Sequence, residues 1–396
     1  MIGFLLGRGN TTVDINHPLT VIAAIYVAVV GPEVFIVQPG FVQGMVAYYG
    51  FSEQEAGYVA SAEMWGIALT TLLMSYLASR IDWRRALLGS ILVMALGNLA
   101  SLGAAGAVSF GWWRFITGLG SGTLVSLSFT MIGLTANPDR NFGYLIMGVL
   151  SYGAIALWLM PSAYGLIGIG GVIVLFALIA LSALPLLRYL PSSGAEHVQI
   201  EADAVDLPRG LRAMALATMF IYFLGQGVVW AYLFLIGTNG GVGEQDVANG
   251  LTVSQFAGVA GAMAAAMIGK RFGRISPISL GILAGIVPLA FLFGNFGALD
   301  YAVVVCIYNF AWNMTHPYLL AAIASFDRGG RLVVHAVGCQ MLGLAVGPAL
   351  AALAIGEHDY SRVLLTGMLF FAVSWGLIMR PLLAQRQRLM AQVSPA

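Results

Sequence analysis

Three ionisable side chains lie inside otherwise apolar segments of the sequence: Glu33, Glu63 and Arg114. A charge at the centre of a lipid bilayer costs about 2.5–3.5 kcal/mol on insertion scales, so such residues are expected to have a function and a partner. At a helical rise of about 1.5 Å per residue, the two carboxyls lie roughly 14–16 Å from the outer ends of their segments, and Arg114 roughly 8 Å. We therefore predict an ion pair between Glu33 and Arg114, with Glu63 as a second carboxyl, in a cluster that takes up and releases a proton.

The same three residues allow plainer interpretations. The pair of Glu33 and Arg114 can be purely structural and lock its helices together. Glu63 can be solvated near the outer end of its helix, because helix boundaries inferred from sequence are uncertain by a few residues.

A polar and aromatic stripe marks the second half of the chain. Asn309, Trp312, Asn313 and His316 are spaced i, i+3, i+4 and i+7, which places them on one face of a helix. Such a face is expected to line a cavity, because ligand sites are mostly apolar with a few placed polar groups. With residues on two other segments, the predicted substrate-binding set is Tyr26, Gln226, Trp230, Asn309, Trp312, Asn313 and His316.

Each of these residues also has a structural interpretation. The two asparagines can bond across helices. His316 is either a neutral packing residue or a second protonation site, and Trp230 can belong to an aromatic belt at the membrane interface.

Other chemistry finds little support in the residues. Met263 and Met267 lie one helical turn apart and suggest a Cu(I) carrier as a minor alternative, but we predict no metal site. No P-loop is present, nor a Gly-x-Ser-x-Gly or His-Glu-x-x-His motif. We therefore predict that the protein is not an enzyme and uses no cofactor, with a proton gradient as its source of energy.

The elements that position these residues are predicted to be membrane-spanning helices. Of 396 residues, 59% are hydrophobic and 9% charged, far below the roughly 25% charged residues of a soluble domain. The net charge of +1 lacks the excess of basic residues that is typical of nucleic-acid-binding proteins. In lipid, continuous apolar runs of about 20 residues form helices. The twelve predicted spans are 19–44, 54–79, 86–106, 109–134, 142–164, 166–188, 211–237, 247–269, 275–296, 299–325, 332–355 and 361–383.

Basic residues orient these spans. With both termini in the cytoplasm, 16 of the 18 Lys and Arg residues fall in cytoplasmic segments, and one, Arg362, falls outside. We predict an integral plasma-membrane protein, in a bacterium the inner membrane, with cytoplasmic N- and C-termini and a monomeric state. A polar stretch at 191–209 reads as a cytoplasmic linker between two six-helix bundles, 1–190 and 210–396.

The two halves repeat each other. Arg80 and Arg271 follow spans 2 and 8 at an offset of 191 residues, and Arg140 and Arg328 follow spans 4 and 10 at an offset of 188. Arg140 and Arg328 are each preceded by an aspartate, Asp139 and Asp327. Parallel six-helix repeats around a midplane site are a known transporter architecture.

This pattern resembles the major facilitator superfamily over essentially the whole chain. The signature of that family between spans 2 and 3, Gly-x-Leu-Ala-Asp-Arg-x-Gly-Arg-Arg/Lys, is kept at Leu77, Ala78, Arg80 and Arg84. It departs at Ser75, Ser79, Asp82 and Trp83. The span-4 pattern Arg-x-x-x-Gly-x-Gly is present at Arg114, Gly118 and Gly120.

The resemblance implies two pseudo-symmetric bundles of six helices, with spans 1, 4, 7 and 10 around a central cavity. It also implies a cytoplasmic gate held by charged loop residues, here Arg80, Asp82, Arg84, Arg85, Asp139, Arg140, Lys270, Arg271, Arg274, Asp327 and Arg328. Ser79 stands where the family has an acidic residue of this gate.

Three functions remain in competition. The first is a proton-coupled transporter of a small organic solute with an aromatic or amphipathic body, working by alternating access. The second is a passive facilitator with the same cavity. The third is a membrane-embedded enzyme or signalling protein, for which the sequence shows no catalytic constellation. The expected partners are the solute and the lipid bilayer, and the direction of transport is left open.

Overall fold

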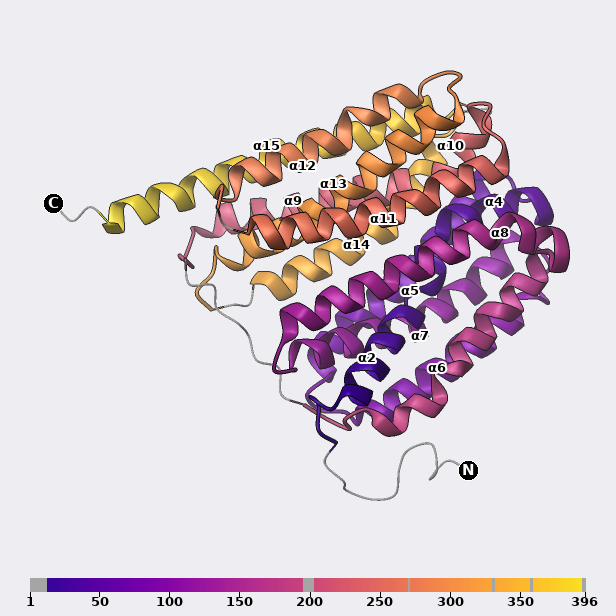
Figure 1. The fold of residues 1–396 in the computed structure, drawn as a ribbon, viewed down its shortest axis with the longest axis horizontal. Coiled ribbons are helices and arrows are strands. Elements are labelled where there is room, and N and C mark those ends of the chain that lie inside the picture. Colours follow the sequence, from indigo (N-terminus) through magenta and orange to yellow (C-terminus); the bar gives the residue numbers. More distant parts are fainter. Residues whose placement is uncertain (1–12, 195–202, 270, 330–331, 357–358, 394–396) are drawn as a thin grey trace. The chain divides into compact units, whose positions relative to one another are not determined.

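The computed structural model describes residues 13–194, 203–269, 271–329, 332–356 and 359–393. The chain divides into two compact units, Met1–His197 and Val198–Ala396, and the division falls inside the polar stretch at 191–209 (Figure 1). The first unit contains α2 (Pro18–Val30), α3 (Glu33–Ile36), α4 (Gln38–Tyr49), α5 (Glu53–Leu77), α6 (Trp83–Ser101), α7 (Ala107–Gly133), α8 (Pro138–Ser182) and the 3-10 helix η1 (Leu184–Tyr189). The second contains α9 (Arg209–Trp230), α10 (Leu233–Asn239), α11 (Glu244–Ile268), α12 (Ile275–Ile286), η2 (Pro288–Leu292), α13 (Ala298–Ala324), α14 (Leu332–Ala354) and α15 (Ser361–Val393).

These helices confirm the all-helical membrane fold and its layout of twelve spans in two bundles. Seven helices in the described ranges are long and apolar enough to cross a membrane by length and composition alone. Helix α8 supplies two spans, because Gly168 adopts φ +65° and interrupts the helix within Pro138–Ser182. Glycine has no Cβ and adopts a positive φ at little cost in conformational energy, so it can form the tight connection between the two spans.

The first span differs from the prediction, because it is broken into three pieces rather than continuous. Pro32 lies between α2 and α3, and Pro39 lies at the start of α4. Proline lacks the backbone N–H that would continue a helix. The carbonyl oxygen of Gly31 accepts a hydrogen bond of 2.5 Å from the hydroxyl of Ser121 on α7. Irregular backbone at membrane depth is tolerated when neighbouring helices satisfy it in this way.

The seventh span repeats this feature in the second unit. Helix α9 ends at Trp230, and α10 begins at Leu233. The hydroxyl of Tyr301, from α13, donates a hydrogen bond of 2.9 Å to the carbonyl oxygen of Leu233. The ninth predicted span is also divided, into α12 and η2, with Pro288 at the start of the second piece.

Close contact between α5 and α7 organises the first unit. A Cβ atom on Gly118 would lie 3.1 Å from the carbonyl carbon of Glu63, and one on Gly122 would lie 3.1 Å from that of Ile67. Small residues four apart allow helix backbones to approach in this way in membranes. Gly343 and Gly347 on α14 approach α9 similarly in the second unit.

Candidate functional site

Arg114, on α7, is fully buried and has three kinds of partner in the first unit. Its Nη2 forms an ion pair with Oε1 of Glu63 on α5, and its Nε donates to Glu63 Oε2 at 3.2 Å. Its Nη1 donates to Oδ1 of Asn98 on α6 at 2.5 Å. The guanidinium carbon lies 5.3 Å from the ring centroid of Phe41 on α4. Four helices therefore converge on one cation.

This geometry corrects the predicted pairing, because Arg114 pairs with Glu63 and not with Glu33. The reason is the glycine-mediated approach of α5 and α7. Gly118 packs against the backbone of Glu63, one turn along α7 from Arg114, so the two side chains face each other directly. Glu63 is buried rather than solvated at a helix end. Such bidentate pairs are the strong ones, since two parallel N–H donors match one carboxylate.

Glu33 is the first residue of α3, in the broken span, and is fully buried. Neither carboxylate oxygen has a hydrogen-bond partner among the described residues. It interacts electrostatically with both Arg114 and Glu63. The three predicted residues therefore do form one cluster, in which Glu63 and Arg114 are paired and the carboxyl of Glu33 has no hydrogen-bond partner among the described residues.

Tyr152, on α8, extends this cluster and was missed by the sequence reasoning. Its hydroxyl is buried without a partner among the described residues, and it interacts electrostatically with Glu33 and Tyr26. Tyr26, on α2, has its hydroxyl 2.5 Å from Ser182 Oγ, and its side chain is half exposed. Asn98 was also missed, although an amide inside an apolar segment is a signal of the same kind as a buried charge.

In the second unit, Trp312 on α13 is the centre of an aromatic cluster. Its ring centroid lies 5.8 Å from that of Trp230, 6.1 Å from that of Tyr308 and 6.5 Å from that of Phe223. The interplanar angles of 66–77° are edge-to-face arrangements, which aromatic pairs prefer. The cluster joins α9 to α13.

Hydrogen-bonding groups border these rings. The ring of His316 lies 4.9 Å from that of Phe223, and its Nε2 is 2.9 Å from Oε1 of Gln340 on α14. The hydroxyl of Tyr308 donates to Oε1 of Gln226. Tyr308 and Gln340 were not among the predicted residues, although Tyr308 lies one helical turn before Trp312 on the same face of α13.

Asn309 and Asn313 bond elsewhere in the second unit. The amide of Asn309 donates to Ser254 Oγ on α11 at 3.1 Å. The amide of Asn313 donates to the side-chain oxygen of Asn309 at 2.8 Å and to its backbone oxygen at 2.9 Å. The bond of Asn309 crosses to another helix, as one alternative interpretation of the sequence had it, whereas Asn313 bonds within α13. Substrate binding by either asparagine stays a prediction.

The charged loop residues of the first unit make local contacts. Asp82 is the N-cap of α6, where its carboxylate accepts from the backbone N–H of Arg85 at 2.9 Å. Arg84 donates through Nε to the carbonyl oxygen of Leu190 at 2.5 Å. Arg80, Asp139 and Arg140 are exposed.

The corresponding residues of the second unit bind the segment that precedes α9. Arg274 pairs with both oxygens of Asp203, at 2.8 and 3.1 Å. Arg328 donates through Nε to the carbonyl oxygen of Ala204 at 3.1 Å. Asp327 lies 3.5 Å from Arg212 Nη1, and Arg271 is exposed. Lys270 lies outside the described residues, and gating by this set stays a prediction.

Met263 and Met267 lie on an exposed face of α11, with 55% and 72% of their surfaces accessible. Two exposed thioethers alone do not enclose a metal ion, since Cu(I) sites depend on converging soft ligands.

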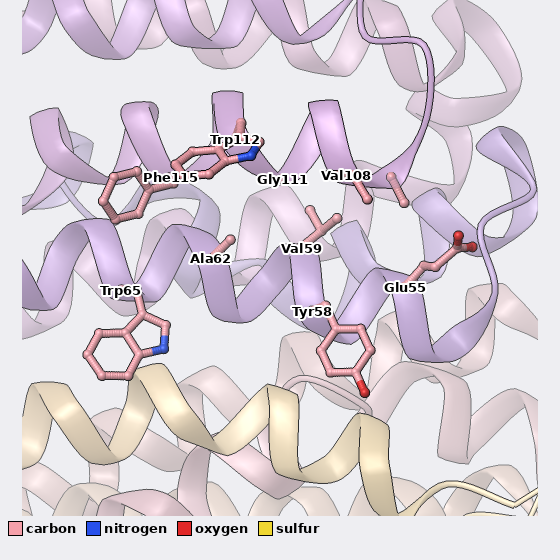
Figure 2. Close-up of a pocket in the computed structure, with 10 residues that line it drawn as sticks. Glu55, Tyr58, Val59, Ala62, Trp65, Val108, Gly111, Trp112 and Phe115 are labelled. Carbon is pink, nitrogen blue, oxygen red and sulfur yellow. The ribbon is translucent and has the colours of Figure 1, made fainter.

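A separate cavity of about 440 Å³ lies against α5 and α7 in the first unit. Figure 2 shows Tyr58 and Trp65 on one helix, and Trp112 and Phe115 on the other. Glu55 is at one end of the cavity, and its carboxylate caps α5 by accepting from the backbone N–H of Ser52 at 2.8 Å. None of the predicted site residues lines this cavity.

Comparison with known proteins gives one family and several relatives. A sequence profile described as the Major Facilitator Superfamily matches residues 23–348. The chain is 27% identical over 349 residues to a gentisate transporter of Corynebacterium glutamicum. The aligned region covers 79% of this chain and 76% of that protein. It is 28% identical over 112 residues to the uncharacterized transporter YycB of Bacillus subtilis, across 26% of this chain and 28% of that protein.

Among solved structures, the chain resembles the xylose transporter XylE from E. coli in a partially occluded inward-open conformation. The TM-score is 0.68 at 16% sequence identity, and the match covers 91% of this chain and 99% of the other. At this identity the likeness describes the fold alone.

Proposed function

The chain belongs to the Major Facilitator Superfamily, and from this premise we propose that it is a proton-coupled transporter of a small solute with an aromatic body. Integral membrane location and transport of a small organic solute follow from the family and its relatives. Access to the solute would alternate between the two sides of the membrane, as in other transporters built from six-helix repeats.

The observation that carries proton coupling is the burial of Glu33 without a hydrogen-bond partner among the described residues. An unpaired carboxylate is costly in a dry interior, so this conformation favours the protonated form. Rehydration of the same carboxyl in another conformation would favour release of the proton. A group that gains and loses a proton as access alternates is what coupling needs.

Arg114 and Glu63 have a different role in this proposal. Their charges cancel, and Asn98 and Phe41 hold the guanidinium further. The pair therefore supplies a fixed dipole beside Glu33, and Glu33 is the carboxyl whose charge changes. Glu63 already balances the charge of Arg114 and engages two of its five N–H donors, so an anionic solute would have to compete with Glu63 for this cation.

The aromatic cluster of Trp230, Trp312 and Phe223, bordered by His316 and Gln226, supports an aromatic body for the solute. Rings offer stacking surfaces, and the amide and imidazole offer hydrogen bonds that fix orientation. The Corynebacterium relative carries an aromatic acid by its name, which makes gentisate the first compound to test.

The segregation of basic residues supports cytoplasmic termini and a plasma-membrane location, the inner membrane in a bacterium. This orientation places Arg80, Arg140 and Arg328 on the cytoplasmic side. The predicted gate would lie there.

Transport in proteoliposomes tests the proposal. Purified protein would be supplied with gentisate, an uncharged ring analogue and an aromatic amine, with and without an imposed pH gradient. We expect one class to accumulate only when the gradient is present. The Glu33→Gln variant should lose accumulation while it still exchanges labelled for unlabelled solute, because binding and conformational change do not need the proton.

Two results would contradict the proposal. Accumulation by Glu33→Gln against a concentration gradient would exclude Glu33 as the coupling residue. Downhill flux of wild-type protein that is indifferent to the pH gradient would favour the passive facilitator instead.

A further inference from the structure

The end of the linker is built into the second unit. The backbone N–H of Val205 donates to the carbonyl oxygen of Ser325 at 2.9 Å, and that of Leu207 donates to Phe326 at 3.2 Å. The side chains of Val205 and Leu207 are buried. Residues 203–207, here called the docked segment, therefore run along the chain that leaves α13 and form a fixed wall of the second unit.

Two arginines hold the docked segment through its backbone. Arg328 donates through Nε to the carbonyl oxygen of Ala204 at 3.1 Å, and Arg388, on α15, donates through Nη1 to that of Asp206. A guanidinium has five N–H donors, so each keeps donors for another acceptor. In the part of the chain that the structure describes, neither guanidinium has a carboxylate partner.

A pocket of about 360 Å³ opens beside these arginines. It is lined by Val205, Asp206, Arg328, Arg388 and Ala391. The lining therefore carries two guanidinium groups and one carboxylate, that of Asp206, which already accepts the backbone N–H of Arg328 at 3.1 Å. The excess of positive charge and the free planar N–H donors suit a phosphate group, which arginine binds with two parallel hydrogen bonds.

The depth of the pocket indicates where that phosphate comes from. Arg388 lies five residues beyond 383, the predicted end of the last span, which is about 8 Å along a helix. The headgroup layer extends roughly 5–8 Å beyond the hydrocarbon on each side of a bilayer. Arg328 follows the last residue of α13, Ala324, by four positions. With the predicted ends of the tenth and twelfth spans, at 325 and 383, both arginines fall within the headgroup layer, where lipid phosphates lie.

We propose that this pocket binds an anionic phosphate group, with a lipid headgroup as its source. On the orientation proposed above, it faces the cytoplasmic leaflet, where anionic lipids attract basic segments. One bound headgroup would connect α15, the end of α13 and the docked segment, and so hold the linker end against the second unit. This site does not depend on proton coupling or on the identity of the solute.

Lipid titration of the full chain in neutral detergent, followed by native mass spectrometry, tests the site. The probes are short-chain phosphatidylglycerol and, in a separate arm, inorganic phosphate. We expect Arg388→Gln to weaken binding of phosphatidylglycerol roughly tenfold, the effect of losing one charged hydrogen bond. The matched control is Arg386→Gln, two residues away on α15, which is exposed and does not line the pocket.

Each outcome decides between the alternatives. Loss of lipid binding in Arg388→Gln but not in Arg386→Gln supports the lipid site, and Arg388-dependent competition by inorganic phosphate supports a phosphate as the recognised group. Binding of phosphate alone would keep the pocket but overturn its lipid source. Equal loss in both variants, or no loss in either, would overturn the site. Arg388→Lys, which keeps the charge, should bind between wild type and Arg388→Gln, which separates recognition from misfolding.

Discussion

At the scale of single residues, the buried cluster contains two carboxyls in opposite situations. Glu63 neutralises Arg114 through a bidentate pair, whereas Glu33 has no hydrogen-bond partner among the described residues. Removing one partner of a buried pair leaves an uncompensated charge and is strongly destabilising. Removing an unpaired carboxyl has no such cost. The same chemical change, Glu to Gln, should therefore act differently at the two positions.

We predict that Glu63→Gln lowers the free energy of unfolding by about 3–5 kcal/mol, because it leaves Arg114 buried and charged. Glu33→Gln should leave it unchanged or raise it slightly. Thermal unfolding of the two variants in the same detergent makes the comparison. Equal destabilisation of both would mean that Glu33 also pairs with Arg114, as the sequence alone suggested.

The sequence was sufficient to find the charged residues of this cluster but not to pair them. Charges inside apolar segments stand out because insertion is costly. Pairing depends on how each helix is rotated and on how closely it approaches its neighbours. The contact of Gly118 with the backbone of Glu63 fixes how α7 is rotated against α5. This contact depends on both helices, so it could not be inferred from either segment alone. Tyr152 was missed because tyrosine is an ordinary residue in a membrane span.

At the scale of helices, close approach of α5 and α7 places Glu63 against Arg114. A Cβ on Gly122 would meet the backbone of Ile67, which cannot move aside as the end of a flexible side chain can. On α6 of the same unit, Gly89 has nothing within 4 Å of the position of an added Cβ. Gly122 and Gly89 therefore lie in helices of the same bundle, but only at Gly122 would an added Cβ meet a neighbouring backbone.

We predict that Gly122→Ala destabilises the protein by about 1–3 kcal/mol, because the extra carbon forces the two helices apart. Gly89→Ala should be neutral, or stabilising by up to about 1 kcal/mol, since alanine is the better helix former. Thermal unfolding measures both. If Gly122→Ala is as stable as Gly89→Ala, the close approach does not hold this bundle together.

Hydropathy predicted the number of spans well, because about 20 apolar residues are needed to cross a bilayer whatever the tertiary structure. Interruptions inside spans were predicted less well. Pro32 and Pro39 were visible in the sequence, yet a proline in a membrane helix produces either a kink or a break. The hydroxyl of Ser121, which bonds the Gly31 carbonyl oxygen at the break, belongs to another helix. The break between α9 and α10 has no proline in it at all.

At the scale of the whole molecule, charge segregation predicts the topology. Ser79, exposed in the basic loop after α5, should lie in the cytoplasm, and Gln54, exposed at the start of the same helix, should lie outside. Ser79→Cys and Gln54→Cys would be made separately with Cys306→Ala and Cys339→Ala. A membrane-impermeant maleimide should label only the Gln54→Cys protein in intact cells, and both proteins after permeabilisation. Labelling of Ser79→Cys in intact cells would invert the orientation.

The docked segment fixes the end of the linker that precedes α9. Asp203 is held by two hydrogen bonds from Arg274, which also donates to Ser325 Oγ at 2.6 Å. Arg274 is itself buried, while the side chain of Asp203 is about a third exposed, so solvent weakens the pair without removing it. The segment should therefore resist cleavage as long as Arg274 is in place.

We predict that Arg274→Gln increases the rate of proteinase K cleavage within residues 203–207 by about tenfold, which corresponds to about 1.4 kcal/mol of lost local stability. The matched control is Arg271→Gln, which changes an exposed arginine of the same loop. N-terminal sequencing of the second-unit fragment would locate the cut. Equal cleavage of wild type and Arg274→Gln would show that the backbone bonds of Val205 and Leu207 hold the segment alone.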